Sequence, residues 1–329
     1  MMNGTVNPRF RAMLLLFIAT LSWAASFPAY KHLLVKLDPM ALQMWRFLLA
    51  AGLIITFRYR EVMKTFRRDV MIPGLFLGVV LWVGYTVQAF GIKWTSASHA
   101  AFLTALLILF GPLFYRIMSG RRFRPIYFGL WFLALVGIGL LTIRNWHWSW
   151  GWGDTLCVVG AIAFGLEMVM VDRWARANNV RPLTFTLLFV IALFTAIICL
   201  ISGQSLHQIR TLNGVDWVAL MGLALFPSWL AFEWQLDAQP YLQTPAATLI
   251  YAMEPLLATL IAYWWVDESL QWVQWIGALC VVLALLGSQR FPIFADAPVE
   301  IHTFGSIDVF SMQGSTDSET AGLLEDSHR

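Results

Sequence analysis

Glu254 is the polar residue of this 329-residue chain that most invites a chemical interpretation, because it stands inside a long apolar stretch. It directly precedes Pro255, and a proline ring frees the backbone carbonyl four residues earlier, which belongs to Tyr251. A carboxylate beside an opened helical turn could bind the amine of a ligand or hold a proton. The alternative is a protonated glutamate that hydrogen-bonds a neighbouring helix and serves packing alone.

Arg46 and Glu167 also fall well inside apolar stretches. A buried arginine can hold a carboxylate through two parallel hydrogen bonds. Arg46 could instead snorkel to the membrane surface, since Trp45 beside it is typical of an interfacial anchor. Glu167 is interpreted either as a cavity residue or as a buried partner for a cation. Asp172, about one turn further on, is expected to be solvated at a helix end.

His99 opens one of the apolar stretches and has a side chain that titrates near physiological pH. We interpret it as a hydrogen-bonded gate or packing residue. No second His or Cys lies one turn away in the sequence, so no metal site is predicted. Cys157, Cys199 and Cys280 lie inside apolar stretches without CxxC spacing, which argues against disulfide or metal use. No cofactor is expected.

Aromatic residues recur at helical spacing in two stretches. Trp82, Tyr85 and Gln88 follow one another at intervals of three, and Trp229 precedes Glu233 by four. Such faces can stack a flat or cationic ligand. The competing interpretation is helix packing or interfacial anchoring, because a chain with 17 Trp residues will place some of them there in any case.

These residues need elements that hold them, and the sequence predicts helices that cross a membrane. Hydrophobic residues make up 59% of the chain and charged residues only 12%, which is too few to solvate a soluble domain. A hydrocarbon core of about 30 Å is crossed by roughly 17–25 helical residues. The stretches of this length are 12–33, 40–57, 70–91, 97–118, 125–143, 152–172, 183–202, 216–235, 244–265 and 271–289. Their continuous apolar runs favour helices over a barrel.

Lys and Arg residues are distributed unevenly between the two sides that these stretches define. With the N-terminus inside, the inner side holds fifteen of them and the outer side only five. The outer five are Lys31, Lys36, Lys93, Arg144 and Arg210. The positive-inside rule therefore predicts a multi-pass protein of the cell membrane with both termini in the cytoplasm. The net charge of +3 is a signal of topology and does not indicate nucleic acid as a partner.

The ten stretches divide into two sets of five that resemble each other. Residues 98–103 (SHAAFL) can be laid over residues 244–249 (TPAATL), and Pro112 then corresponds to Pro255 after a three-residue difference in length. We expect both prolines to kink their helices, with a charge at only one kink, that of Glu254. An odd number of spans per half makes the second half enter the membrane from the opposite side. The predicted fold is an all-α polytopic membrane protein: ten transmembrane helices as two inverted five-helix repeats around a central cavity.

The predicted organisation has five parts. They are a cytoplasmic N-terminus at 1–11, a first five-helix repeat at 12–143, an outer connection at 144–151, a second five-helix repeat at 152–290, and a cytoplasmic, mostly disordered tail at 291–329.

Several short motifs resemble one known family. They are LSWAASF at 21–27, WRF at 45–47, TSASHAAFLTAL at 95–106, TPAA at 244–247 and EPL at 254–256. In their order and spacing they are similar to EamA-type members of the drug/metabolite transporter superfamily, over about residues 12–290. The resemblance implies ten helices in two inverted repeats, a central cavity, and export or exchange of small metabolites. Trp23 of the first motif joins the candidate cavity residues.

The function that we expect is secondary transport of small metabolites, either amino acids or related amphipathic compounds, by alternating access within a lipid bilayer. Arg46 would meet a carboxylate and Glu254 an amine. Proton coupling through Glu254 or Glu167 and passive exchange both stay open, as do the direction of transport and a monomeric or homodimeric state. Organic-cation or drug efflux and translocation of sugar nucleotides or lipids are alternatives on the same scaffold. A membrane enzyme is disfavoured, because neither HExxH, GxSxG nor a paired-acid motif occurs in the sequence.

Overall fold

The computed structural model describes residues 7–95, 100, 103–142, 151–175, 179–203, 206–242, 244–266, 271–291 and 294. Within these residues the backbone is helical almost throughout and forms no β-strand, although one isolated bridge pairs Phe123 with Phe294. A helix satisfies its backbone hydrogen bonds internally, which is what a segment surrounded by lipid requires. The all-helical prediction for a polytopic membrane protein therefore agrees with the structure.

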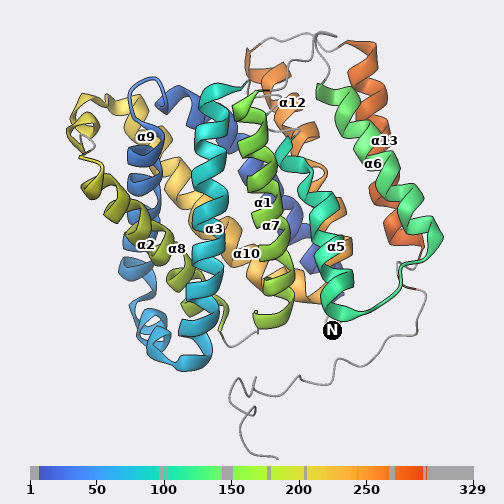
Figure 1. Ribbon diagram of the computed structural model, residues 1–329, viewed down its shortest axis with the longest axis horizontal. Helices are drawn as coiled ribbons and strands as arrows, with labels where there is room; N and C mark the ends of the chain where they lie inside the picture. The colour runs from blue at the N-terminus through green and yellow to red at the C-terminus, as the bar shows by residue number, and fades with distance from the viewer. Residues whose placement is uncertain are drawn as a thin grey trace, which may run out of the picture. The chain divides into compact units, whose positions relative to one another are not determined.

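The helices follow one another with short connections (Figure 1). Their bounds are α1 Pro8–Leu33, α2 Pro39–Val62, α3 Arg68–Trp94, α5 Leu107–Ser119, α6 Pro125–Thr142, α7 Trp152–Trp174, α8 Val180–Ile201, α9 Gly214–Leu223, α10 Ala231–Ala238, α11 Thr244–Tyr251, α12 Glu254–Val266 and α13 Trp272–Arg290. Short 3-10 turns are η1 Met63–Phe66, η2 Leu206–Thr211 and η4 Gln239–Tyr241, and a π-helix, η3 Ala224–Leu230, joins α9 to α10.

Six helical runs are long and apolar enough to cross a membrane. They are α1, α2, α3, α7, α8 and the continuous run Gly214–Tyr241. Shorter apolar helices cover Leu103–Ser119, Pro125–Leu140 and Trp272–Ser288. These runs coincide with predicted stretches to within a few residues at most ends, as expected for boundaries read from apolar patterns.

Three predicted spans are not continuous α-helices within the described residues. The stretch predicted at 97–118 has a turn at Leu106. The other two breaks lie close to prolines. The stretch predicted at 216–235 contains the π-helix, which surrounds Pro227. The stretch predicted at 244–265 is interrupted at Ala252 and Met253, just before Pro255, where the Met253 N–H bonds the Ile250 carbonyl at 3.0 Å. A proline lacks the N–H that an unbroken helix needs at its position, so both irregularities lie where the backbone ladder is already incomplete.

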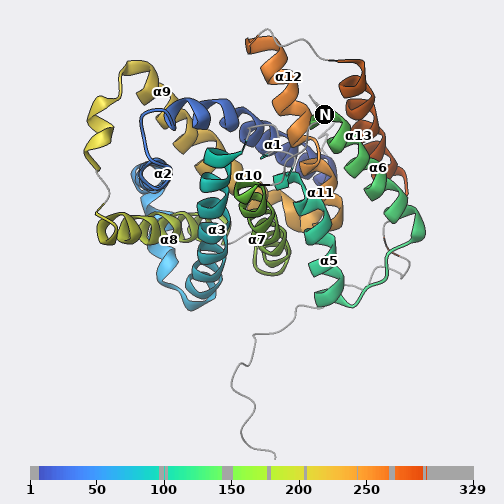
Figure 2. The same cartoon turned by 45° about the horizontal axis from the view of Figure 1, so that its top comes forward.

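Helices that are distant in the sequence pack side by side. α2 packs against α8, and α6 packs against α13. α1 lies against α9, α10, α11 and α12, whereas α7 lies against α3 and α5. Figures 1 and 2 both show α6 and α13 as a pair at one side of the helical assembly.

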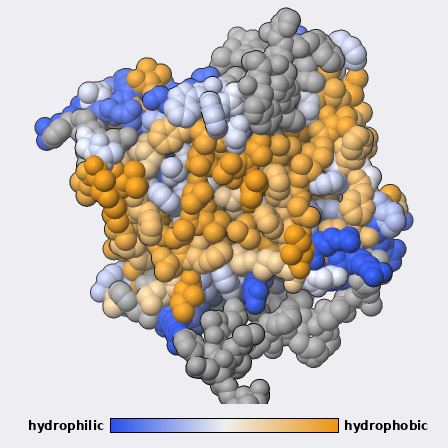
Figure 3. Space-filling model, in the orientation of Figure 1, coloured by the Kyte–Doolittle hydropathy of each residue, from blue (hydrophilic) through white to orange (hydrophobic). Residues whose placement is uncertain are grey.

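Charged side chains gather at two opposite ends of the helices, on either side of an apolar band (Figure 3). One end, which we call the Asp216 end, joins the last turn of α1 to the first turn of α9. There Asp216 accepts a hydrogen bond from Lys36 Nζ at 2.5 Å and lies 2.8 Å from His32 Nε2. This carboxylate is fully buried, and Lys36 compensates its charge while the His32 ring lies within hydrogen-bond distance.

The opposite end, which we call the Glu233 end, joins α2, α8 and α10. Arg181 Nε donates to Glu233 Oε1 at 3.4 Å, and Arg58 Nη2 lies 3.9 Å from the same oxygen. Arg181 also pairs with Glu61, whose carboxylate accepts from Lys64. Such half-exposed pairs contribute little stability each, and their main effect is to fix which helix ends meet.

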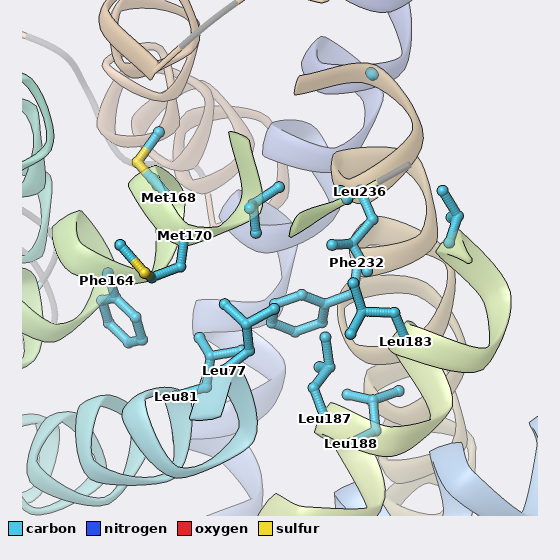
Figure 4. Close-up of a cluster of buried hydrophobic side chains, with 14 of the residues drawn as sticks. Leu77, Leu81, Phe164, Met168, Met170, Leu183, Leu187, Leu188, Phe232 and Leu236 are labelled. Carbon is cyan, nitrogen blue, oxygen red and sulfur yellow. The ribbon is translucent and has the colours of Figure 1, made fainter. Parts of the chain in front are cut away.

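The largest apolar cluster lies where α3, α7, α8 and α10 meet (Figure 4). Its central side chains include Leu77, Leu81, Phe164, Leu187 and Phe232. Within a bilayer, association of such helices depends on close packing rather than on exclusion of water. The cluster therefore holds these helices rigidly together. Neighbouring turns of the same helices carry polar side chains, which the cluster supports.

Small residues allow the helices of the α6 and α13 pair to approach closely. A Cβ built on Gly137 of α6 would lie 2.7 Å from the Gly277 carbonyl oxygen and 2.9 Å from Cys280 Cβ. Contacts this short do not occur between real side chains and backbone, so only glycine fits at position 137. Gly129, two turns earlier on α6, has no heavy atom within 4 Å of the equivalent point.

We predict that Gly137→Ala destabilises the protein by about 1–3 kcal/mol, because the added methyl group overpacks the crossing of α6 and α13. Gly129→Ala is the matched control on the same helix, and it should be neutral or slightly stabilising because alanine favours the helix. Thermal unfolding of the two variants in detergent checks this. Equal unfolding midpoints for both would contradict the close crossing.

Candidate functional site

A cavity lies between the helices in the half of the protein nearer the Asp216 end. Its walls come from α1, α2, α3, α7, α10, α11 and α12. Leu107, the first residue of α5, and Thr104, just before that helix, also contribute. The cavity and its open mouth together hold about 830 Å³ of space that protein atoms do not fill. Leu81, Phe164 and Phe232 link it to the apolar cluster of Figure 4.

The structure brings seven of the ten predicted cavity residues to this one cavity. They are Trp23, Arg46, Tyr85, Gln88, Glu167, Tyr251 and Glu254. Trp82 and Trp229 do not line it. His99 lies outside the described residues.

Trp82 and Trp229 are directed elsewhere by helix geometry. Three-residue steps fall short of a 3.6-residue turn by about 60° each, so Trp82 and Gln88 differ by about 120° around α3. Trp82 packs on Phe194 of α8 with ring centroids 5.5 Å apart. Trp229 Nε1 donates to Glu233 Oε2 at 2.8 Å and so belongs to the Glu233 end.

Arg46 is the buried cation of the cavity, with only 3% of its surface exposed. Its Nε donates to Ser228 Oγ at 2.6 Å, and its Cζ lies 4.9 Å from the Phe47 ring centroid and 5.3 Å from that of Tyr85. Among the described residues, Nη2 has no hydrogen-bond partner and no carboxylate pairs with the guanidinium. The predicted alternative of snorkelling does not fit this burial. A guanidinium that lines a cavity and has an unpaired nitrogen is a candidate group for holding the carboxylate of a ligand.

The π-helix η3 is what presents Ser228 to Arg46. Ser228 Oγ donates to the Leu223 carbonyl at 2.8 Å, so its lone pairs remain free to accept from the arginine. Trp23 Nε1 donates to the carbonyl of the adjacent Pro227 at 2.8 Å. Helices of this type occur mostly as single-turn irregularities and often at functional sites. Here the irregular turn anchors two cavity residues from α1 and α2.

Glu254 stands at the first position of α12 and faces the cavity. Within the described part of the chain, no hydrogen bond or ion pair engages its carboxyl group. Gly111, which the comparison of the two halves of the sequence sets against Glu254, leaves little room for a side chain, because a Cβ there would lie 2.8 Å from Thr248 Cγ2 of α11. α5 continues as a helix through Pro112, and the turn that precedes it lies at Leu106.

Glu167 lies at the inner boundary of the cavity and is 3% exposed. Gln235 Nε2 donates to its two carboxyl oxygens at 3.3 and 3.1 Å and also to Gln239 Oε1 at 3.2 Å. Tyr251 OH donates to the same Gln239 oxygen at 3.4 Å. Across the described residues no three His, Cys, Asp or Glu side chains gather as metal ligands. The hydrogen bonds that Glu167 accepts within the described residues thus come from one neutral amide, that of Gln235.

Asp172 continues this polar network towards the Glu233 end. Its carboxyl group accepts from the Thr244 N–H and hydroxyl, at the first residue of α11, and from Gln239 Nε2 at 3.0 Å. Gln239 also donates to the Met168 carbonyl. Asp172 is half-buried, so the expectation of a solvated helix end was wrong. A carboxylate at a helix N-terminus satisfies backbone donors that would otherwise be unpaired, which is why α11 begins there.

The sequence interpretation missed the neutral amides of the site. Gln43 lines the cavity, and Gln235 and Gln239 build the network beneath it. A glutamine inside an apolar stretch is a weak signal beside a charge, yet each amide buried in lipid needs up to four partners. Listing every Asn and Gln within the predicted spans would have found Gln43 and Gln235, whereas Gln239 lies in the connection between the stretches 216–235 and 244–265.

Comparison with known proteins gives the relatives of this chain. The sequence profile described as the EamA-like transporter family matches residues 10–143 and 151–288. An uncharacterized transporter of Archaeoglobus fulgidus is 26% identical over 84% of this chain and 85% of its own length. A biotin transporter of Escherichia coli is 27% identical over 84% of this chain and 93% of its own.

One solved crystal structure shares the fold. It superposes with a TM-score of 0.71 and covers 86% of this chain and 97% of its own, at 18% sequence identity. Such a likeness concerns the fold alone. The family match spans most of the chain and both groups of helices that build the cavity. This chain is a multi-pass membrane transporter of the EamA-like transporter family, and it is not an enzyme.

Proposed function

We propose that this chain is a secondary transporter that carries small amphipathic carboxylates, with Arg46 as the residue that binds the carboxylate. The observation that carries the proposal is the buried guanidinium whose Nη2 has no partner within the described residues. A buried charge without a compensating group is costly, so a ligand that brings a carboxylate would stabilise it. The E. coli relatives are named biotin transporters, and biotin too is a carboxylate.

We further propose ten membrane crossings in two inverted repeats. The family profile matches two successive stretches of similar length. The contacts between helices support the same idea. We replace each of the ten proposed crossings by the crossing five places away in the chain. The contacts of α7 with α3 and α5 then become the contacts of α1 with α9 to α12. The same operation leaves the α2 and α8 pair and the α6 and α13 pair unchanged. A two-fold relation between halves explains this pattern.

The Glu233 end is proposed to face the cytoplasm. It gathers Arg58 and Arg181, and Arg11 pairs with Asp237 there at 3.2 Å. A bias of positive residues towards one end favours the cytoplasmic side for that end. The cavity then belongs to the outward half of the protein, and both chain termini belong to the cytoplasm of a cell-membrane protein.

Alternating access is supported by the position of the polar network. The hydrogen bonds among Glu167, Gln235, Gln239, Asp172 and Thr244 lie between the cavity and the Glu233 end. These groups hold α7, α10 and α11 together beneath the cavity. We propose that they form the cytoplasmic seal, which opens when the cavity turns inward.

Glu254 favours a second candidate, transport of organic cations. Its carboxyl group faces a cavity whose walls include the aromatic rings of Trp23 and Tyr85, a combination that suits a cationic ligand. Amino acids satisfy both candidates, since they carry a carboxylate and an amine. Uptake into proteoliposomes can be measured for a panel of labelled amino acids, biotin, organic cations and sugar phosphates. This panel distinguishes the two candidate functions. Measuring uptake at two pH values also detects proton coupling.

We predict that Arg46→Gln lowers carboxylate uptake by about 30-fold or more, because loss of a buried charge-assisted pair costs several kcal/mol. Arg46→Lys should retain part of the uptake, since it keeps the charge and loses the planar fork. Arg9→Gln, which changes an exposed arginine at the start of α1, serves as the control. Carboxylate uptake that survives Arg46→Gln, or uptake of organic cations alone, would sink the proposal.

The orientation can be tested with single cysteines in a variant whose three native cysteines are replaced by alanine. Val35 between α1 and α2 is 83% exposed, and Met63 at the end of α2 is 53% exposed. A membrane-impermeant maleimide applied to intact cells should label Val35→Cys and leave Met63→Cys unlabelled until the cells are opened. The reverse pattern would invert the proposed orientation.

Thr244→Val should weaken the proposed seal, because it removes the hydroxyl donor from Asp172 while preserving shape. Loss of such a bond shifts the balance towards the inward-open state. With a reporter cysteine at Ser26 in the cavity, labelling from outside should slow by about twofold or more. Thr184→Val, whose hydroxyl bonds only the Val180 carbonyl of its own helix, is the control. Equal labelling rates in both variants would argue against the seal.

A further inference from the structure

Gln43 leaves a buried acceptor unpaired at the cavity wall. The side chain is 1% exposed, and its Nε2 donates to Thr86 Oγ1 and Thr195 Oγ1, each at 3.2 Å. Its Oε1 has no hydrogen-bond partner among the residues that the structure describes. An amide oxygen buried without a donor costs free energy, so a group that supplies an N–H would stabilise it.

The hydrogen bonds of Thr195 determine which end of the Gln43 amide is unpaired. Thr195 Oγ1 donates its only proton to the Ile191 carbonyl at 2.7 Å, so it can only accept from Gln43. The Gln43 NH₂ group must therefore face Thr195, and an exchange of its nitrogen and oxygen would place two acceptors against each other. The free atom of Gln43 is consequently the acceptor and not the donor.

Gln43 and Arg46 lie three residues apart on α2 and both line the cavity. Side chains at this spacing stand next to each other on one helix face, with Cβ atoms about 5–6 Å apart. Two neighbouring side chains of the cavity wall therefore carry an unpaired acceptor, Gln43 Oε1, and an unpaired donor, Arg46 Nη2, among the described residues. A ligand that satisfies both would carry its carboxylate and an N–H donor close together.

We propose that Gln43 is a specificity-determining residue that accepts a hydrogen bond from the α-nitrogen of the transported carboxylate. This inference rests on the proposed role of Arg46 in the same cavity. The substrate class becomes narrower: acids with an amino or acylamino group on the carbon next to the carboxylate, rather than simple carboxylic acids. Glu254, on helix α12, is then available to contact the rest of the transported acid.

The test compares matched pairs of acids in proteoliposomes: leucine with 4-methylpentanoate, phenylalanine with 3-phenylpropanoate, and alanine with propanoate. The readout is the ratio of kcat/KM within each pair, because a ratio cancels differences in the amount of folded protein. In the unchanged protein we expect the nitrogen-bearing acid to be favoured by about tenfold or more for at least one pair.

Gln43→Met keeps the length of the side chain and removes the acceptor. We expect the ratio to fall towards one in this variant, while the simple acid is still transported and still requires Arg46. Gln208→Met is the matched control, since Gln208 bonds Asp38 and does not line the cavity. It should leave the ratio unchanged.

The outcomes separate this inference from the proposed function. Uptake of both kinds of acid that depends on Arg46, with the same ratio in the unchanged protein and in Gln43→Met, would mean that water satisfies the amide oxygen, and it would overturn the role of Gln43 alone. Failure to transport any acid of either kind would overturn the carboxylate proposal and, with it, this inference.

Discussion

The interior of this protein is governed by one constraint: a polar group buried among these helices must find its partners in the protein or in a ligand, because lipid offers none. Several residues meet the constraint locally. Thr184 and Thr195, for example, donate to carbonyls of their own helix. Arg46 meets it only in part, since Ser228 takes one donor and aromatic faces shield the charge. The nitrogen of Arg46 that stays unpaired among the described residues is the basis for the anion site that we propose.

The polar network at the boundary of the cavity satisfies the same constraint in a different way. Glu167 and Asp172 are engaged by amides, a hydroxyl and a backbone N–H, and no cation pairs with them within the described residues. Neutral hydrogen bonds contribute only about 0.5–1.5 kcal/mol each, whereas breaking a buried ion pair is far more costly. In the seal that we propose, such bonds hold the helices in register and can still break. The ion pairs of the described residues, by contrast, lie at the two ends of the helices, where water screens the charges.

The sequence predicted the helices well because their signal is long and redundant. Twenty apolar residues tolerate an error at any one position, so the bounds of α1 to α3 and α13 agree with the predicted stretches to within a few residues at most ends. Charged cavity residues were equally visible, because a charge in an apolar run has few explanations. The prediction that Trp82 shares the cavity face with Tyr85 and Gln88 does not match the cavity lining, because residues three apart shift progressively around a helix. Gln43, Gln235 and Gln239 were missed because a neutral amide is meaningful only when its partners in other helices are known.

The difference between Glu254 and Gly111 follows from packing. If the two halves are inverted repeats, as we propose, these positions correspond, yet they face different surroundings. A Cβ built on Gly111 would lie 2.8 Å from Thr248 Cγ2 of α11, and a Cβ built on Gly165 of α7 would lie 2.8 Å from the Gly111 nitrogen. Helix contact has therefore excluded a side chain at position 111, while position 254 opens into the cavity. The backbone can keep a two-fold relation while the cavity walls do not, and a cavity with one cation on α2 and one free carboxyl group on α12 is suited to a molecule whose two ends differ.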